Sequence, residues 1–115
     1  MIYRFLSRIA IVLLISISAL AQTVTVKIIE TSDVHGAIFP YDLKENKETT
    51  SSLARVTTYL KEQRADSNQI VFLLDNGDIL QGDPVVYYYN FEKTDTIHLY
   101  ADVMNYMQYD AATIG

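Results

Sequence analysis

The chain has 115 residues, with nine lysines and arginines against 14 aspartates and glutamates, two histidines and no cysteine. The net charge of −5 argues against binding a nucleic-acid polymer, which requires a basic face. The absence of cysteine excludes disulfides and a lipid-modified cysteine. So acidic a chain would also repel anionic substrates, unless bound cations reverse the local field.

Residues 1–21 have the pattern of a secretory signal peptide. Arg4 and Arg8 give a basic start, the apolar run 9–20 follows, and an A-x-A pattern ends at Ala21. A run of 12 residues is shorter than the roughly 20 that a bilayer-spanning helix needs. We therefore expect cleavage after Ala21 and a periplasmic or secreted product with no stable membrane anchor. The alternative is an uncleaved anchor.

The remaining residues, 22–115, alternate between strand-like and helix-like segments. The expected elements are a buried strand at 24–29, a long polar loop at 37–50, a helix capped by Ser51 or Ser52 and ending near Arg64, a buried strand at 70–74, a helix at 97–107 and a strand at 111–114. The second helix is expected to turn Leu99, Val103, Tyr106 and Met107 inward. This alternation predicts an α/β fold with a parallel sheet, whose ligands gather beyond the carboxyl ends of the strands.

Polar residues follow both of the expected buried strands. Asp33 and His35 follow the first strand, and an extended segment would point both side chains to one side, where they could hold one cation. Oxygen and nitrogen ligands suit manganese, iron or zinc. Asp78 comes after Gly77 at the end of the second strand. Each also has a plainer interpretation, as a residue that caps local backbone or sits in a β-turn. Asp75 is a competing carboxylate that could instead bond to backbone or to a neighbouring side chain.

Asp33, His35 and Asp78 would converge from adjacent strand ends. A carboxylate that bridges two cations holds them about 3.5–4 Å apart, which is the spacing of two-metal hydrolases. Such a pair clamps a phosphate, stabilises charge on the leaving oxygen and acidifies water. The three residues together therefore predict a two-metal centre.

Three segments resemble the motifs of one family. Residues 31–36 resemble the first metal motif, D-x-H-G, of the calcineurin-like metallophosphoesterases. Residues 77–84 resemble the second motif in its 5′-nucleotidase form, G-D-x-x-Q-G-x-P. Residues 104–105 and 109–115 are similar to the approach to the third motif, G-N-H, whose glycine would be Gly115.

The resemblance implies a four-layer α/β/β/α metallophosphoesterase sandwich, of which residues 22–115 would be the truncated N-terminal part. It implies that Asp33 and His35 bind one of two divalent metal ions (manganese, zinc, iron or similar) and that Asp78 bridges both. The catalytic histidine would follow Gly115, so no catalytic residue is expected within this chain, and the fragment alone is expected to be inactive. The C-terminal domain that binds the nucleoside would also be absent.

The resemblance further implies a parent enzyme that hydrolyses nucleotides or other small phosphoesters. Two forms are expected, a 5′-nucleotidase or a 2′,3′-cyclic nucleotide phosphodiesterase. The alternative is a catalytically silent secreted binding domain that keeps the fold. His98 is expected to be structural or solvent-facing, and residues 87–89, three tyrosines, are expected to pack or lie on the surface rather than stack on a base.

Overall fold

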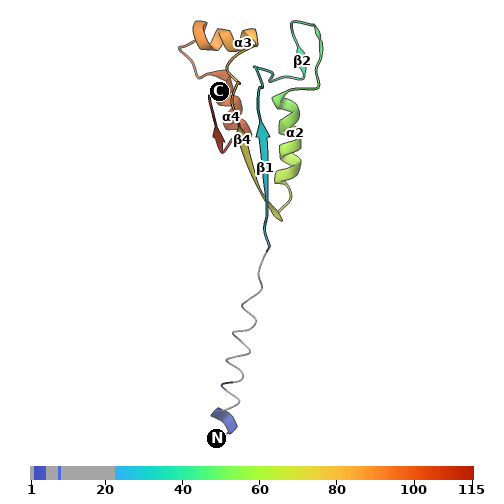
Figure 1. Cartoon of the computed structure of the whole chain (residues 1–115), viewed down its shortest axis with the longest axis vertical. Helices are drawn as coiled ribbons and strands as arrows, with labels where there is room; N and C mark the ends of the chain where they lie inside the picture. The colour runs from blue at the N-terminus through green and yellow to red at the C-terminus, as the bar shows by residue number, and fades with distance from the viewer. Residues whose placement is uncertain (1, 5–7, 9–22) are drawn as a thin grey trace.

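The computed structural model describes residues 2–4, 8 and 23–115 (Figure 1). The expected cleavage site after Ala21 and the apolar run before it lie outside the described residues. Within the part of the chain that is described, no helix is long and apolar enough to cross a membrane.

A parallel sheet forms the centre of the fold, as the alternation of strands and helices predicted. Its strands are β1 (Thr25–Thr31), β4 (Gln69–Asp75) and β5 (Ala111–Ala112), in the order β1-β4-β5. Asp75 at the end of β4 pairs with Thr31 at the end of β1 and with Ala112 of β5. The three strands therefore end at the same edge of the sheet, where the loops that carry the polar motifs begin.

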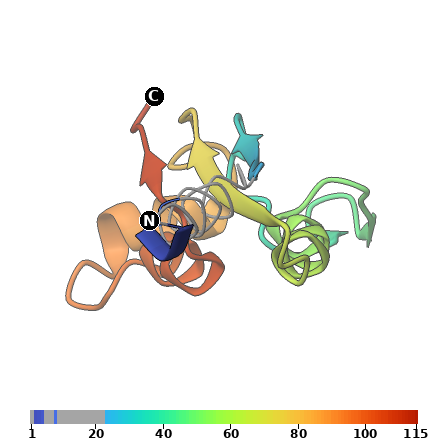
Figure 2. The same ribbon diagram turned by 90° about the horizontal axis from the view of Figure 1, so that it is seen from below.

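Helices connect the strands and lie on one side of the sheet (Figure 2). They are α2 (Leu53–Arg64), between β1 and β4, and α3 (Pro84–Tyr87), the π-helix η1 (Tyr88–Glu92) and α4 (Leu99–Met107), between β4 and β5. The expected cap of the first helix is confirmed, because the Ser52 hydroxyl accepts a hydrogen bond from the Arg55 N–H at 3.3 Å.

The helical segment at 84–92 was missed by the sequence analysis. It is too short to show an apolar stripe, but its start carries a local signal. The Asp83 carboxylate accepts from the Val85 N–H at 3.0 Å, and Pro84 occupies the first helical position, which needs no N–H donor. The same Asp-Pro pair closes the second motif, so the motif also starts a helix.

The core lies between the helices and the covered face of the sheet. Its buried apolar residues are Ile38, Leu53, Leu60, Leu73, Ile79, Val86, Tyr100 and Met107. The expectation that Tyr106 faces inward was wrong, since its side chain is 69% exposed and Tyr100 is buried instead. Successive helical residues are rotated by about 100°, and Tyr106 lies one such step from buried Met107, outside the apolar stripe.

The two long strands turn one face toward the helices and leave the other face exposed. Val26 and Ile28 of β1 pair with Ile70 and Phe72 of β4, and all four side chains are exposed. A continuous apolar run does not reveal which face is covered, because alternate residues point to opposite sides. The described residues thus form one sheet and one helix layer of the expected four-layer sandwich.

The expected long loop at 37–50 contains a small antiparallel hairpin, β2 (Tyr41–Asp42) and β3 (Lys47–Glu48). Asp42 builds the turn, because its carboxylate accepts from the N–H groups of Glu45 and Lys44. These backbone hydrogen bonds lower the pKa of Asp42, with Glu45 the larger cause. The polar composition correctly predicted a loop but did not predict the strand pair within it.

Candidate metal centre

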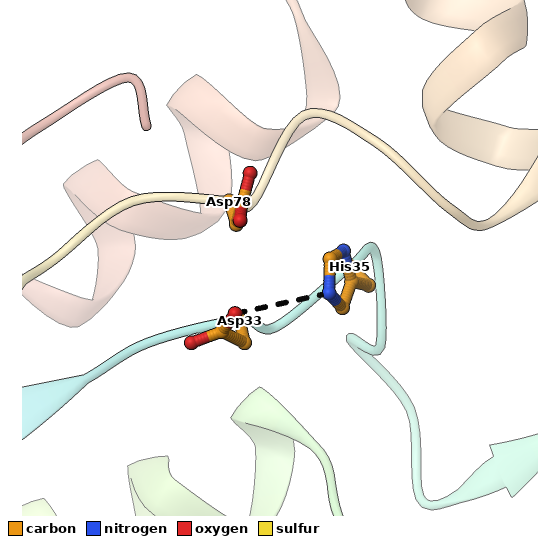
Figure 3. A group of neighbouring side chains, drawn as sticks. All are labelled: Asp33, His35 and Asp78. Atoms are coloured by element: carbon orange, nitrogen blue, oxygen red, sulfur yellow. Dashed lines mark ion pairs between the residues drawn. The ribbon is translucent and has the colours of Figure 1, made fainter.

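Three potential ligands converge at the carboxyl edge of the sheet (Figure 3). Asp33 and His35 lie in the loop after β1, and Asp78 lies in the facing loop after β4. Their ligand atoms all lie within 4.8 Å of one another, and the three side chains are exposed. The His35 Nε2 atom is 4.0 Å from an Asp33 oxygen. The convergence expected from the sequence is therefore present in the fold.

Backbone hydrogen bonds hold the two loops together beyond the end of the sheet. The Asp33 N–H donates to the Gly77 carbonyl at 3.1 Å, and the His35 N–H donates to the Asp78 carbonyl at 3.0 Å. These bonds continue the pairing of β1 with β4 into the site. The separation of the three side chains is thus set by main-chain contacts rather than by flexible side chains.

The backbone at the site is left-handed. Asp33, His35 and Asp78 have φ angles of 53°, 47° and 58°. The premise of an extended segment was therefore wrong, although its conclusion that Asp33 and His35 converge holds. A non-glycine residue with positive φ is uncommon and costs of order 1–3 kcal/mol where the conformation is sparsely populated. Three such residues at one site are typical of a functional constellation, where surrounding contacts maintain strained backbone.

Contacts with residues 81–83 orient the imidazole of His35. Its Nδ1 atom lies 3.1 Å from the Gln81 carbonyl, and a carbonyl can only accept, so Nδ1 is the donor. In the neutral tautomer that fits this bond, Nε2 presents its lone pair to the site. The Asp83 N–H donates to the His35 carbonyl at 3.1 Å. Gly82 permits this approach, because a Cβ there would lie 2.9 Å from the His35 Cβ. Two carboxylates and a correctly presented imidazole fit a divalent transition metal.

An open cavity of about 290 Å³ lies beside His35. The strand β2 with the turn that follows it, the loop around Gly36 and Asp83 contribute to its walls. Lys44 reaches across from the hairpin and donates from Nζ to the Gly82 carbonyl at 3.1 Å. Neither the Lys44 contact nor the His35 contact with Gln81 follows from the sequence, because both are made to backbone oxygens that no residue pattern specifies.

Asp75 lies outside the group of potential ligands. Its side chain is buried, and it bonds to the Thr31 hydroxyl at 2.7 Å and the Gly77 N–H at 3.1 Å. This agrees with the interpretation that Asp75 bonds to backbone and a neighbouring side chain. Asp75 is therefore buried and hydrogen-bonded, unlike the three exposed potential ligands.

His98 has a structural position. Its Nδ1 atom accepts from the Tyr100 N–H at 3.2 Å, which caps α4, and its Nε2 lies 2.9 Å from the Asn90 side-chain oxygen. The ring centroids of Tyr89 and His98 are 5.6 Å apart. Burial raises the pKa of Tyr100, with the Asp83 charge a second cause. These contacts are those of packing residues, as expected for His98.

Comparisons with known proteins agree with this fold. No protein-family model matches the chain. The chain is 36% identical over 102 residues to the trifunctional nucleotide phosphoesterase protein YfkN of Bacillus subtilis (strain 168), covering 83% of this chain and 7% of that protein. It is 30% identical to the 2′,3′-cyclic-nucleotide 2′-phosphodiesterase/3′-nucleotidase of Yersinia enterocolitica, covering 92% of this chain and 17% of that protein.

A solved structure resembles the described fold. The crystal structure of the calcineurin-like phosphoesterase YfkN from Bacillus subtilis matches with a TM-score of 0.65 and 35% identity, over 76% of this chain and 28% of that structure. Fold and sequence together make this chain a homologue of the calcineurin-like phosphoesterases. Its homologues are nucleotide phosphoesterases and nucleotidases, and the chain spans less than a fifth of the length of the two relatives compared by sequence.

Proposed function

We propose that the full-length protein is a metal-dependent phosphoester hydrolase that acts on nucleotides, as a 5′-nucleotidase or a 2′,3′-cyclic-nucleotide phosphodiesterase. The observation that carries this proposal is the convergence of Asp33, His35 and Asp78 at the carboxyl edge of the sheet. The nucleotide substrates named for the homologous proteins support it.

Each of the three residues has a defined role in the proposal. Asp33 and the Nε2 atom of His35 would hold one divalent cation, and Asp78 would bridge it to a second. Manganese, zinc or iron would suit this mixture of oxygen and nitrogen ligands. Cations bound there supply charge that polarises a phosphoryl group and acidifies water. They would also reverse the field of an acidic chain that otherwise repels nucleotides.

The end of the described chain approaches the same site. A Cβ on Gly115 would lie 2.6 Å from the Asp78 nitrogen, so the two backbones are in close contact. We propose that residues after Gly115 supply the remaining ligands and the catalytic histidine. The strand β5 would deliver them to the same edge of the sheet as Asp33 and Asp78.

Substrate hydrolysis by the purified full-length protein tests the proposed function. With Mn²⁺, we expect phosphate release from 5′-AMP or ring opening of 2′,3′-cyclic AMP, and loss of the activity when a chelator is added. Boiled protein with the same metal is the control for hydrolysis by free Mn²⁺. If the protein binds Mn²⁺ but hydrolyses neither nucleotide, the result would favour the silent binding domain.

We also propose that the protein is exported to the periplasm or the medium. The support is the sequence alone, namely the basic Arg4 and Arg8, the short apolar run and the A-x-A pattern at Ala21. The expected result is a mature N-terminus at Gln22, measured by mass spectrometry of the product purified from the periplasm or the medium. A cytoplasmic product that keeps residues 1–21 would contradict export.

A further inference from the structure

We propose that the buried Asp75 carboxylate is a positioning residue for the metal centre, which joins the ends of β1 and β4 and fixes the turn that presents Asp78. This inference rests on the proposed function in that it takes Asp33, His35 and Asp78 as metal ligands. It adds a residue that touches neither the metal nor the substrate.

Asp75 accepts two hydrogen bonds from two different segments. Its side chain is 3% exposed, its Oδ1 accepts from the Thr31 hydroxyl at 2.7 Å, and its Oδ2 accepts from the Gly77 N–H at 3.1 Å. Thr31 ends β1, two residues before Asp33, whereas Gly77 immediately precedes Asp78. One buried carboxylate thus connects the loops that carry the candidate ligands.

Gly77 is held on both sides. Its N–H is bound by Asp75, and its carbonyl accepts from the Asp33 N–H at 3.1 Å. The φ angle of Gly77 is 101°, and that of Asp78 is 58°. The two hydrogen bonds restrain the peptide groups on either side of Gly77, and the direction of the Asp78 side chain depends on their rotation. Without Asp75, the Gly77 N–H would lose its partner and the turn would be free to relax.

A third segment completes the network. The Thr31 hydroxyl uses its one proton in the hydrogen bond that it donates to Asp75. The Tyr109 hydroxyl, 2.8 Å from the Thr31 oxygen, is therefore the donor in the second bond. Burial raises the pKa of Tyr109, with the Asp75 charge adding to the effect, so this donor stays protonated well above neutral pH. Tyr109 lies just before β5, and the Thr113 N–H donates to the Asp75 backbone carbonyl at 3.0 Å. All three strand ends therefore meet at Asp75.

Substitutions at Asp75 separate positioning from general stability. In the full-length protein, Asp75→Ala removes both hydrogen-bond acceptors. We expect Mn²⁺ binding to weaken by about 10–100-fold, the loss that is typical when a residue that supports the metal ligands is removed. Asp75→Asn keeps the shape, since its oxygen can accept from Gly77 and its NH₂ can donate to Thr31. We expect it to recover most of the affinity. Leu73→Ala is the matched control, because it opens a cavity in the same strand without touching the network.

Two measurements read the result. Isothermal titration of the metal-free proteins with Mn²⁺ gives the affinities, and amide hydrogen exchange measured by NMR reports on the Gly77 and Asp33 N–H groups. We expect faster exchange at both amides in Asp75→Ala than in Asp75→Asn. Leu73→Ala should lower Tm while leaving Mn²⁺ affinity near that of the wild type.

Three outcomes would overturn the inference. They are wild-type affinity in Asp75→Ala, an equal loss of affinity in Leu73→Ala, and a wild-type protein that binds no Mn²⁺. Failure of the proposed function looks different. A wild type that binds Mn²⁺ but hydrolyses no nucleotide would refute the enzyme, while the order of affinities among the variants would still support or refute the role of Asp75.

Discussion

Asp78→Asn in the full-length protein is expected to lower kcat/KM for nucleotide hydrolysis by on the order of 10³-fold or more, roughly 4 kcal/mol of transition-state stabilisation. A bridging carboxylate offsets the repulsion between two cations and sets their separation. Asparagine keeps the shape of the side chain but removes the charge. Both cations should then bind weakly, and the charge that acidifies water should be lost with them.

Metal content measured beside activity distinguishes this effect from misfolding. Asp95→Asn is the matched control, because Asp95 is exposed and pairs with Lys93 at the surface, where ion pairs contribute little. Asp95→Asn should keep both cations and the rate. If Asp78→Asn also keeps both cations and most of the rate, the assignment of Asp78 as the bridge is refuted.

His35→Ala is expected to lower kcat/KM by on the order of 10²-fold or more, at least about 2.7 kcal/mol. The imidazole would supply the single nitrogen ligand from this chain, and its Nδ1 bond to Gln81 already presents Nε2 to the site. Alanine removes the ligand and leaves the carboxylates of Asp33 and Asp78 with an incomplete coordination shell.

The other histidine of the chain provides the control. His98→Ala removes the cap of α4, which should cost about 1 kcal/mol of stability, a value typical of a lost cap. Metal content and kcat/KM should be unchanged. Equal losses of metal in the two variants would show that His35 acts through folding rather than as a ligand.

Much of the fold follows from local patterns in the sequence. The apolar runs that became β1 and β4, the serine before α2 and the alternation of strands and helices were sufficient to predict a parallel sheet with its polar loops at one edge. Each of these signals lies within a short segment. The structure confirms the parallel pairing of the strands and the cap at Ser52.

Other features depended on contacts between distant segments. Asp33 and His35 converge through left-handed backbone, which is maintained by hydrogen bonds to residues of the Gly77–Asp78 turn. No periodicity in the sequence reports such a conformation. The apolar runs of the strands also did not specify which residues lie on the exposed face, where Ile28 and Phe72 are found.

The sequence alone did not distinguish Asp75 from Asp78 as a potential metal ligand. The spacing of Asp75 from Asp78 made it a competing ligand, and only burial and partners separate the two carboxylates. Asp75 lies beneath the site with both oxygens bonded, whereas Asp78 is exposed among the potential ligands. Two carboxylates only three residues apart in the chain thus have different environments, one buried and one exposed.

The most direct test of the metal centre is the position of bound metal in crystals of the full-length protein soaked in Mn²⁺. Anomalous scattering should show manganese within about 2.0–2.4 Å of an Asp33 oxygen, the Nε2 atom of His35 and an Asp78 oxygen, distances in the range of oxygen and nitrogen ligands to divalent metals. Manganese bound elsewhere, or coordinated without Asp78, would contradict the account.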